Sequence, residues 1–167
     1  LLITTQGTAS LHAFHVLRQE VEVRRRLGVL FGGDKGLYNQ LSARENLRYF
    51  GRLYGMTDDL IARRSAELLD QVGLTDRAGE RVESYSRGMK QRLHIAKTLV
   101  HRPPVVILDE PTIGLDPAAA IDVRSLIAAL TPQHSVLLRT HDMHDEDVLC
   151  SQLAIVDSGV IVAEGRS

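Results

Sequence analysis

The sequence predicts an α/β domain with a mainly parallel sheet and an inserted helical subdomain, and three observations predict this fold class. Short β-branched apolar runs alternate with longer amphipathic stretches, the pattern of strands separated by helices. Two helical stretches follow one another between the first two strand-like runs, with no strand between them. The 167 residues suffice for one domain with a sizeable core. We therefore expect residues 1–167 to form one domain, with the helical subdomain at about residues 40–100.

Composition and charge exclude several classes of protein. The chain has 20 Lys and Arg against 21 Asp and Glu, and 44% of its residues are hydrophobic. A disordered chain would be less apolar and more highly charged, and a general nucleic-acid binder would be basic. No apolar run approaches the ~20 residues that cross a bilayer. Cys150 is the only cysteine, which excludes an intrachain disulfide and favours a reducing compartment.

Five apolar runs are predicted to be strands. Four of them are interpreted as buried strands, because they are short, continuous and rich in β-branched residues. The fifth follows Asp157-Ser158-Gly159, where the glycine supplies the positive φ of a tight hairpin. In chain order, the predicted strands are Leu27–Phe31, Val105–Asp109, Val136–Leu138, Leu153–Val156 and Val160–Ala163.

The first predicted helix begins with a capping box. Ser42 accepts a hydrogen bond from a free backbone N–H of the first turn, and Glu45 reaches back to the Ser42 backbone. Leu47, Phe50 and Tyr54 then recur at helical spacing, until a glycine ends the helix.

A second helix is predicted to begin near Asp58 and Asp59, whose negative charges suit a helix N-terminus. It ends before Gly73. Its apolar face would consist of Ile61, Leu68, Leu69 and Val72.

Two adjacent acids, Asp109 and Glu110, follow the apolar run Val105–Leu108. In an open α/β sheet, ligands bind at the carboxyl ends of the strands. One carboxylate there can hold Mg²⁺ beside nucleotide phosphates, and the next can orient or deprotonate an attacking water. The alternative is that both acids only end the strand and start the next turn.

Segment Tyr85–Arg92 contains a helix start with features of an anion site. Ser86 is a good N-cap residue, and Gly88 allows a ligand to approach the backbone closely. Free N–H groups at a helix N-terminus bind anions such as phosphate. An ordinary capped helix remains the alternative for this segment.

Two further residues lie close to strand ends or helix starts. Asp116 precedes Pro117 and a helix that we expect from about Ala118 to Leu130, so it is either a simple N-cap or part of a site. His141 follows the predicted strand Val136–Leu138 and would share a sheet edge with the two acids if the strands are parallel. Its imidazole could hydrogen-bond a terminal phosphate, and a surface turn is the alternative.

The joint order of these features resembles the nucleotide-binding domain of ATP-binding cassette (ABC) transporters over nearly the whole chain. Tyr85–Arg92 is similar to the family signature, and Val105–Pro111 to the Walker B strand. Gly114–Pro117 matches the D-loop, and His141 the switch histidine. Arg44–Leu47, Tyr54-Gly55 and Thr140–Met143 resemble the bacterial exporter branch of the family. The fold class implied is a P-loop NTPase-like core.

The resemblance implies a role for each matched residue. Asp109 would hold Mg²⁺, Glu110 would be the catalytic base or water-orienting group, and His141 would contact the γ-phosphate of ATP. Residues of the signature and the D-loop would contact ATP held by a second nucleotide-binding domain or couple the two sites. These residues are Ser86, Arg87, Gly88, Met89 and Asp116.

The resemblance also implies partners and a location. The partners would be a second nucleotide-binding domain, most simply in a homodimer, and a separate integral membrane permease, with no nucleic acid. The protein would be cytoplasmic and peripheral at the inner face of the cell membrane. The loop that follows the first predicted strand, through Tyr38, would face the permease.

Two features depart from the family pattern. No Gly-x-x-x-x-Gly-Lys-Ser/Thr run occurs, although this loop supplies the phosphate-binding lysine of P-loop NTPases. Leu1-Leu2 resembles the tail of the helix that follows this loop, so we expect an N-terminally truncated domain that hydrolyses no ATP by itself. Gly32-Gly33 stands where the family has a metal-sensing glutamine, and Asp34 is the nearest polar side chain.

Two alternative functions stay open at this point. The missing phosphate loop favours a degenerate or regulatory nucleotide-binding module without hydrolysis, whereas the Asp109-Glu110 pair disfavours it. A non-transport ABC ATPase is the other alternative, and the compact segment between residues 27 and 86 lacks the heptads of chromosome-type members.

Overall fold

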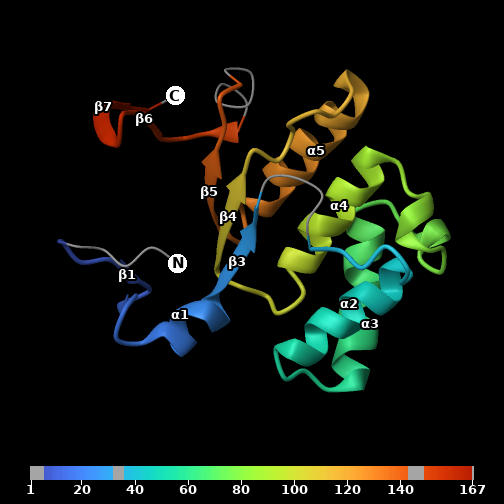
Figure 1. The fold of residues 1–167 in the computed structure, drawn as a ribbon. Coiled ribbons are helices and arrows are strands. Elements are labelled where there is room, and N and C mark those ends of the chain that lie inside the picture. Colours follow the sequence, from blue (N-terminus) through green and yellow to red (C-terminus); the bar gives the residue numbers. More distant parts are fainter. Residues whose placement is uncertain (1–5, 32–35, 143–148, 167) are drawn as a thin grey trace.

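The computed structural model describes residues 6–31, 36–142 and 149–166 (Figure 1). Its centre is a three-stranded parallel sheet of β3 (Leu27–Leu30), β4 (Val105–Asp109) and β5 (Ser135–Arg139), in the order β3-β4-β5. The predicted parallel sheet is thus confirmed. Phe31, predicted as a strand residue, lies outside β3 and is 72% exposed.

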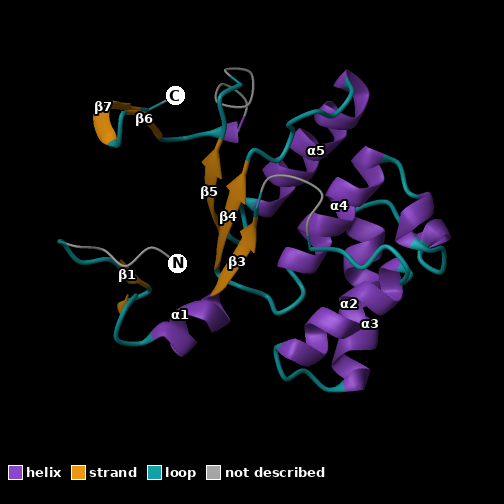
Figure 2. Ribbon diagram, viewed as in Figure 1, coloured by secondary structure: helices purple, strands orange, loops and turns teal. Residues whose placement is uncertain are grey.

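Helices fill the segment between β3 and β4, as the sequence predicts. They are α2 (Ala43–Leu53), α3 (Asp58–Gln71) and α4 (Arg87–Thr98), with the short 3-10 helices η1 (Thr75–Arg77) and η2 (Val82–Ser84) between α3 and α4. Helix α5 (Pro117–Leu130) connects β4 to β5. Figure 2 shows these helices on one side of the sheet.

The predicted helix starts are confirmed at atomic detail. The hydroxyl of Ser42 accepts a hydrogen bond from the backbone N–H of Glu45 at 3.2 Å, and the Glu45 carboxylate accepts one from the Ser42 N–H at 2.7 Å. These bonds satisfy donors that the first turn of α2 leaves free. The hydrogen bond from the Ser42 backbone is the main cause that lowers the pKa of Glu45.

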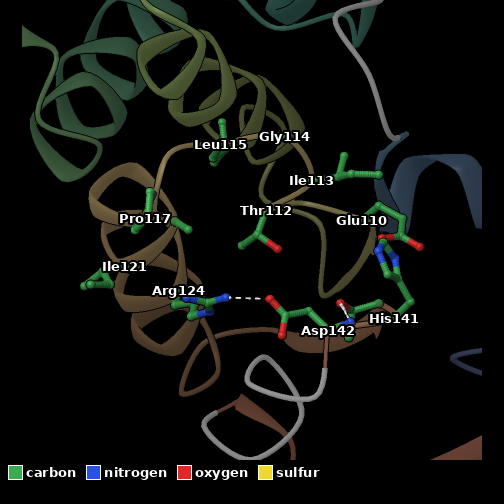
Figure 3. A pocket seen from close by; sticks show the side chains of 12 residues that line it. Glu110, Thr112, Ile113, Gly114, Leu115, Pro117, Ile121, Arg124, His141 and Asp142 are labelled. Atoms are coloured by element: carbon green, nitrogen blue, oxygen red, sulfur yellow. Dashed lines mark hydrogen bonds and ion pairs between the residues drawn. The ribbon is translucent and has the colours of Figure 1, made fainter.

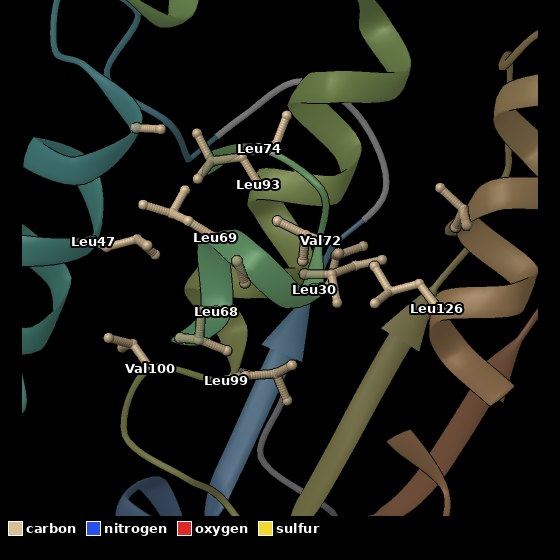
Figure 4. Packing of buried hydrophobic residues seen from close by; sticks show 14 of the residues in the cluster. Leu30, Leu47, Leu68, Leu69, Val72, Leu74, Leu93, Leu99, Val100 and Leu126 are labelled. Carbon is tan, nitrogen blue, oxygen red and sulfur yellow. The ribbon is translucent and has the colours of Figure 1, made fainter. Parts of the chain in front are cut away.

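The hydrophobic core lies between the sheet and the helices (Figure 4). Leu30, Val106 and Leu108 point from the sheet into it, and they alternate with less buried residues along their strands. Leu68, Leu69 and Val72 of the predicted apolar face are buried in this core, and Ile61 is buried against Gly51 of α2. Gly28 allows β3 to pass the end of α4, because a Cβ at this position would lie 2.7 Å from the Thr98 carbonyl oxygen. Close packing therefore fixes the carboxyl ends of the strands relative to the helices.

Three short elements before the sheet have no counterpart in the sequence prediction. They are β1 (Ser10–Leu11), β2 (Phe14–His15) and α1 (Glu20–Arg26). Their lengths of two to seven residues are too short to produce a recognisable hydrophobic period.

The last two strands, β6 (Leu153–Asp157) and β7 (Val160–Gly165), form an antiparallel hairpin. The predicted tight turn is confirmed, since Ser158 and Gly159 both have positive φ. The prediction that Leu153–Val156 is buried is wrong: nearly all residues of β6 are exposed. Val136–Leu138 is also less buried than predicted, with Leu137 61% exposed, because the helices cover only one face of the sheet. A continuous apolar run does not reveal whether both faces of a strand are covered.

In the part of the chain that the structure describes, no helix is both long and apolar enough to cross a membrane.

Candidate functional site

The two acids and the histidine meet at the carboxyl edge of the sheet, as the sequence predicts. β4 and β5 run parallel, so their ends reach the same edge. The Nδ1 atom of His141 lies 2.5 Å from Oε2 of Glu110, and Figure 3 shows these two side chains facing one another. Three residues from two neighbouring strand ends therefore form one polar cluster.

Glu110 is held in an unusual backbone conformation, with φ of +50°. Its N–H donates to the carbonyl oxygen of Arg139 at 2.8 Å, and its own carbonyl accepts from the Ile113 N–H at 3.3 Å. Its side chain is only 16% exposed. Non-glycine residues rarely adopt positive φ, and such residues gather at functional sites. The chain thus fixes the direction of this carboxylate through the backbone.

Helix α4 supports the turn that follows Glu110. Nε2 of Gln91 donates to the carbonyl oxygen of Pro111 at 2.7 Å. This bond joins the helix that begins at the predicted signature to the loop that carries the acid. Sequence reasoning missed Gln91, because 20 residues separate the two partners and only the packing of α4 brings them together.

Sequence reasoning also missed Arg139, the last residue of β5. Its guanidinium donates to Oδ1 of Asp109 at 2.6 Å and lies 3.6 Å from Oε1 of Glu110. The hydrogen bond to Asp109 is the main cause that raises the pKa of Arg139. The register pairs Asp109 with Arg139, whereas the predicted strand ended one residue earlier, at Leu138, so the sequence did not indicate this pairing.

The signature-like residues lie at the start of α4. The hydroxyl of Ser86 accepts from the Met89 N–H at 3.2 Å, which confirms the predicted N-cap. A Cβ at Gly88 would lie 2.8 Å from the Cβ of Ala119, so α4 and α5 touch here without space for a side chain. The starts of these two helices are therefore neighbours.

Arg87 and Asp116 lie beside this contact. The Arg87 guanidinium packs against Gly114, where a Cβ would be 2.5 Å from one of its nitrogens. Gly114 has φ of +66°, another reason why this position favours glycine. Asp116 caps α5 by accepting from the Ala119 N–H at 3.0 Å. The side chains of Ser86 and Asp116 thus cap the helices that they begin. Both residues stand at helix N-termini, which can attract anions.

A cavity of about 410 Å³ adjoins Glu110 (Figure 3). One wall is apolar and belongs to the turn after β4 and to α5. The opposite wall is polar, and the ion pair between Arg124 and Asp142, 2.9 Å apart, connects the two sides. The lining residues are Glu110, Thr112, Ile113, Gly114, Leu115, Pro117, Ala120, Ile121, Arg124, Thr140, His141 and Asp142.

The carboxylate oxygens of Asp109 and Glu110 are of the kind that binds Mg²⁺ together with substrate phosphates. The described residues include no group of three or more His, Cys, Asp or Glu side chains that could hold a metal by themselves. Mg²⁺ often binds through only one or two carboxylates, with waters and substrate phosphates as its other ligands. Asp109, whose side chain is 33% exposed at the sheet edge, fits this mode.

Several sequence predictions fall outside the described residues. Leu1-Leu2, Gly32-Gly33, Asp34 and Met143 lie there, so nothing is added to the predictions made for them.

The sequence is similar to known proteins over nearly its whole length. A family described as "ABC transporter" matches residues 1–113. The chain is 39% identical over 166 residues to the ABC transporter ATP-binding protein NatA of Bacillus subtilis (strain 168), covering 99% of this chain and 68% of that protein. It is 32% identical over 160 residues to the linearmycin resistance ATP-binding protein LnrL of the same strain. These residues cover 95% of this chain and 51% of that protein.

A third relative is the doxorubicin resistance ATP-binding protein DrrA of Mycobacterium tuberculosis (strain ATCC 25618 / H37Rv). It is 37% identical over 162 residues, which are 96% of this chain and 49% of that protein. The chain thus spans 68% of the length of one of these three relatives and about half the length of the other two.

Proposed function

The chain belongs to the ABC transporter family, and from this premise we propose that it is the ATP-binding and ATP-hydrolysing part of an exporter. The observation that carries the proposal is the contact between Glu110 and His141 at the carboxyl edge of a parallel sheet. Relatives whose names include drug resistance favour export as the direction of transport. The energy of ATP hydrolysis would drive transport through a separate membrane permease.

Glu110 is proposed as the group that orients and deprotonates the attacking water. Phosphoryl transfer depends mostly on positioning and charge stabilisation, so a carboxylate with a fixed direction suits the task. His141, in contact with one oxygen of Glu110, would hold this carboxylate and hydrogen-bond the γ-phosphate of ATP.

Asp109 is proposed as the ligand of Mg²⁺. When bound, the metal would neutralise charge on the phosphates. Asp109 ends β4 in register with Arg139 of β5, so its carboxylate is held at the sheet edge.

The starts of α4 and α5 are proposed to face a second nucleotide-binding domain. Ser86, Arg87, Gly88 and Met89 would contact the ATP of that domain, because a helix N-terminus and a guanidinium both attract phosphate. Asp116 would couple the two sites through the neighbouring helix start. The support is the tight contact of Gly88 with Ala119, which holds both helix starts together.

Two exposed tyrosines are proposed to face the permease. The hydroxyls of Tyr38 and Tyr49 lie 3.1 Å apart, and the half-buried ring of Phe50 packs edge-on against Tyr49. The buried side chain of Asn46 fixes the backbone of Tyr38 with hydrogen bonds of 2.8 and 3.0 Å. Aromatic side chains that remain exposed on a rigid support are common at protein interfaces. The protein would then be cytoplasmic and peripheral at the inner face of the membrane.

The experiment is an ATP-dependent mass measurement on the complete gene product that carries this sequence. Glu110→Gln keeps the shape of the side chain but removes the base, so bound ATP should persist between two copies. We expect this variant to double its mass by light scattering when ATP and Mg²⁺ are added, with little change on adding ADP. An unchanged mass with ATP, in a variant that binds ATP, would contradict the shared-site proposal.

A second candidate is a regulatory nucleotide-binding module without hydrolysis. One observation favours it: Gly32 and Gly33 stand where the family pattern has a metal-sensing glutamine. This candidate predicts that the complete gene product binds ATP without turnover. Steady release of phosphate from ATP excludes it.

A further inference from the structure

We propose that Arg139 is a positioning residue of this site, an exchangeable counter-ion that holds the two acids and gives up Asp109 when a divalent cation binds. The inference rests on the proposed function, because it assumes that Asp109 is a metal ligand. It adds a residue that neither the family motifs nor the sequence pattern single out.

The backbone fixes Arg139 beside both acids. In the parallel register, Arg139 lies opposite Asp109, and its carbonyl oxygen accepts from the Glu110 N–H at 2.8 Å. The side chain therefore starts next to two carboxylates. Its guanidinium donates to Oδ1 of Asp109 at 2.6 Å and stands 3.6 Å from Oε1 of Glu110.

The four polar side chains form a row in which acids and bases alternate. The order is Asp109, Arg139, Glu110 and His141, joined by the distances of 2.6, 3.6 and 2.5 Å. The two oxygens of Glu110 face different partners, Arg139 on one side and His141 on the other. The guanidinium thus separates two acids that are neighbours in the sequence and would otherwise repel one another.

A divalent cation on Asp109 would stand close to the Arg139 guanidinium, which already binds Oδ1 of the same carboxylate. Two positive groups on one carboxylate repel each other, so a bound cation favours a guanidinium that has moved away. The exchange requires little free energy, because the Arg139 side chain is 71% exposed and exposed ion pairs are weak. Arg139 should therefore weaken cation binding without preventing it.

The test is the affinity for Mn²⁺, used as a probe of the magnesium site, of the complete gene product that carries this sequence. The EPR signal of free Mn²⁺ in solution reports binding without any need for ATP or turnover. The variants are Arg139→Gln, which removes the charge, and Arg139→Lys, which keeps it. Arg24→Gln is the matched control, since Arg24 forms an ion pair of the same length, 2.6 Å, at 63% exposure. Arg24 lies in α1, before the opposite end of β3.

Arg139→Gln is expected to bind Mn²⁺ about two- to fivefold more tightly, the factor that corresponds to one exposed ion pair. Arg139→Lys and Arg24→Gln should bind like the unchanged chain. Equal affinity of Arg139→Gln and the unchanged chain, or an equal gain in Arg24→Gln, would overturn the role of Arg139. Asp109→Asn separates the two proposals: if it leaves Mn²⁺ affinity unchanged, the metal role of Asp109 is wrong, and the inference about Arg139 is wrong with it.

Discussion

At the scale of single residues, side chains near the sheet are held by bonds from elements distant in sequence. His101 is an example, and it lies beside Leu27, the first residue of β3. Its Nε2 lies 3.2 Å from the Leu27 carbonyl oxygen, and its ring stacks on Tyr54 with centroids 3.7 Å apart. The Nδ1 atom is buried and has no hydrogen-bond partner among the described residues. Burial is the main cause that lowers the pKa of His101 below its ordinary value of 6.5.

This arrangement predicts a loss of stability in mild acid. The unfolded chain takes up a proton on His101 at a higher pH than the folded chain, so protonation favours unfolding. The contribution is fully present above pH 6.5 and is lost as the pH falls below that value. Thermal unfolding of the unchanged chain should therefore show a larger drop in Tm between about pH 7.5 and 5.5 than His101→Gln does.

His101→Gln keeps an N–H that can donate to Leu27 but cannot be protonated in this range. The other six histidines are the same in both chains, so the comparison isolates one group. The same drop in Tm in both chains would contradict this account of His101.

At the scale of elements, the contact between the starts of α4 and α5 determines the shape of the proposed interface. Gly88 meets the Cβ of Ala119, a rigid atom that cannot move aside as the end of a long side chain can. Gly88→Ala should destabilise the chain by overpacking, and Ala119→Gly should restore the space. The coupling between the two substitutions should be about 1–3 kcal/mol, measured by denaturant unfolding of both single variants and the double variant.

The double variant is the informative control, because helix propensities change in each single variant and cancel in the coupling. Additive effects of the two substitutions would show that α4 and α5 do not touch at this point.

Local signals predicted the elements, whereas the site needed long-range geometry. Ser42 with Glu45, Ser86 and Asp116 are caps whose chemistry lies within four residues, and all three helix starts were predictable. The pairing of Glu110 with His141 followed from two strand ends and the assumption of a parallel sheet. Gln91 and Arg139 were missed, because their partners depend on packing and register, which no local pattern contains.

At the scale of the whole molecule, the helices lie on one side of the parallel sheet (Figure 2), and the side chains of Asp109 and His141 at its carboxyl edge are 33% and 71% exposed. The acidic pair, the histidine and the cavity lie at this edge, and the starts of α4 and α5 lie beside it. The exposure of the β6–β7 hairpin was not predictable, because an apolar run is the same in sequence whether or not another layer covers it.

The most direct test of the central claim, that Glu110 activates water at the sheet edge, is phosphate release from ATP by the complete gene product. Glu110→Gln should lower turnover by about 10²–10⁴-fold, the usual contribution of a general base, while ATP binding persists. Glu164→Gln, an exposed acid of β7, should turn over ATP like the unchanged protein. Turnover of Glu110→Gln equal to that of Glu164→Gln would contradict the claim.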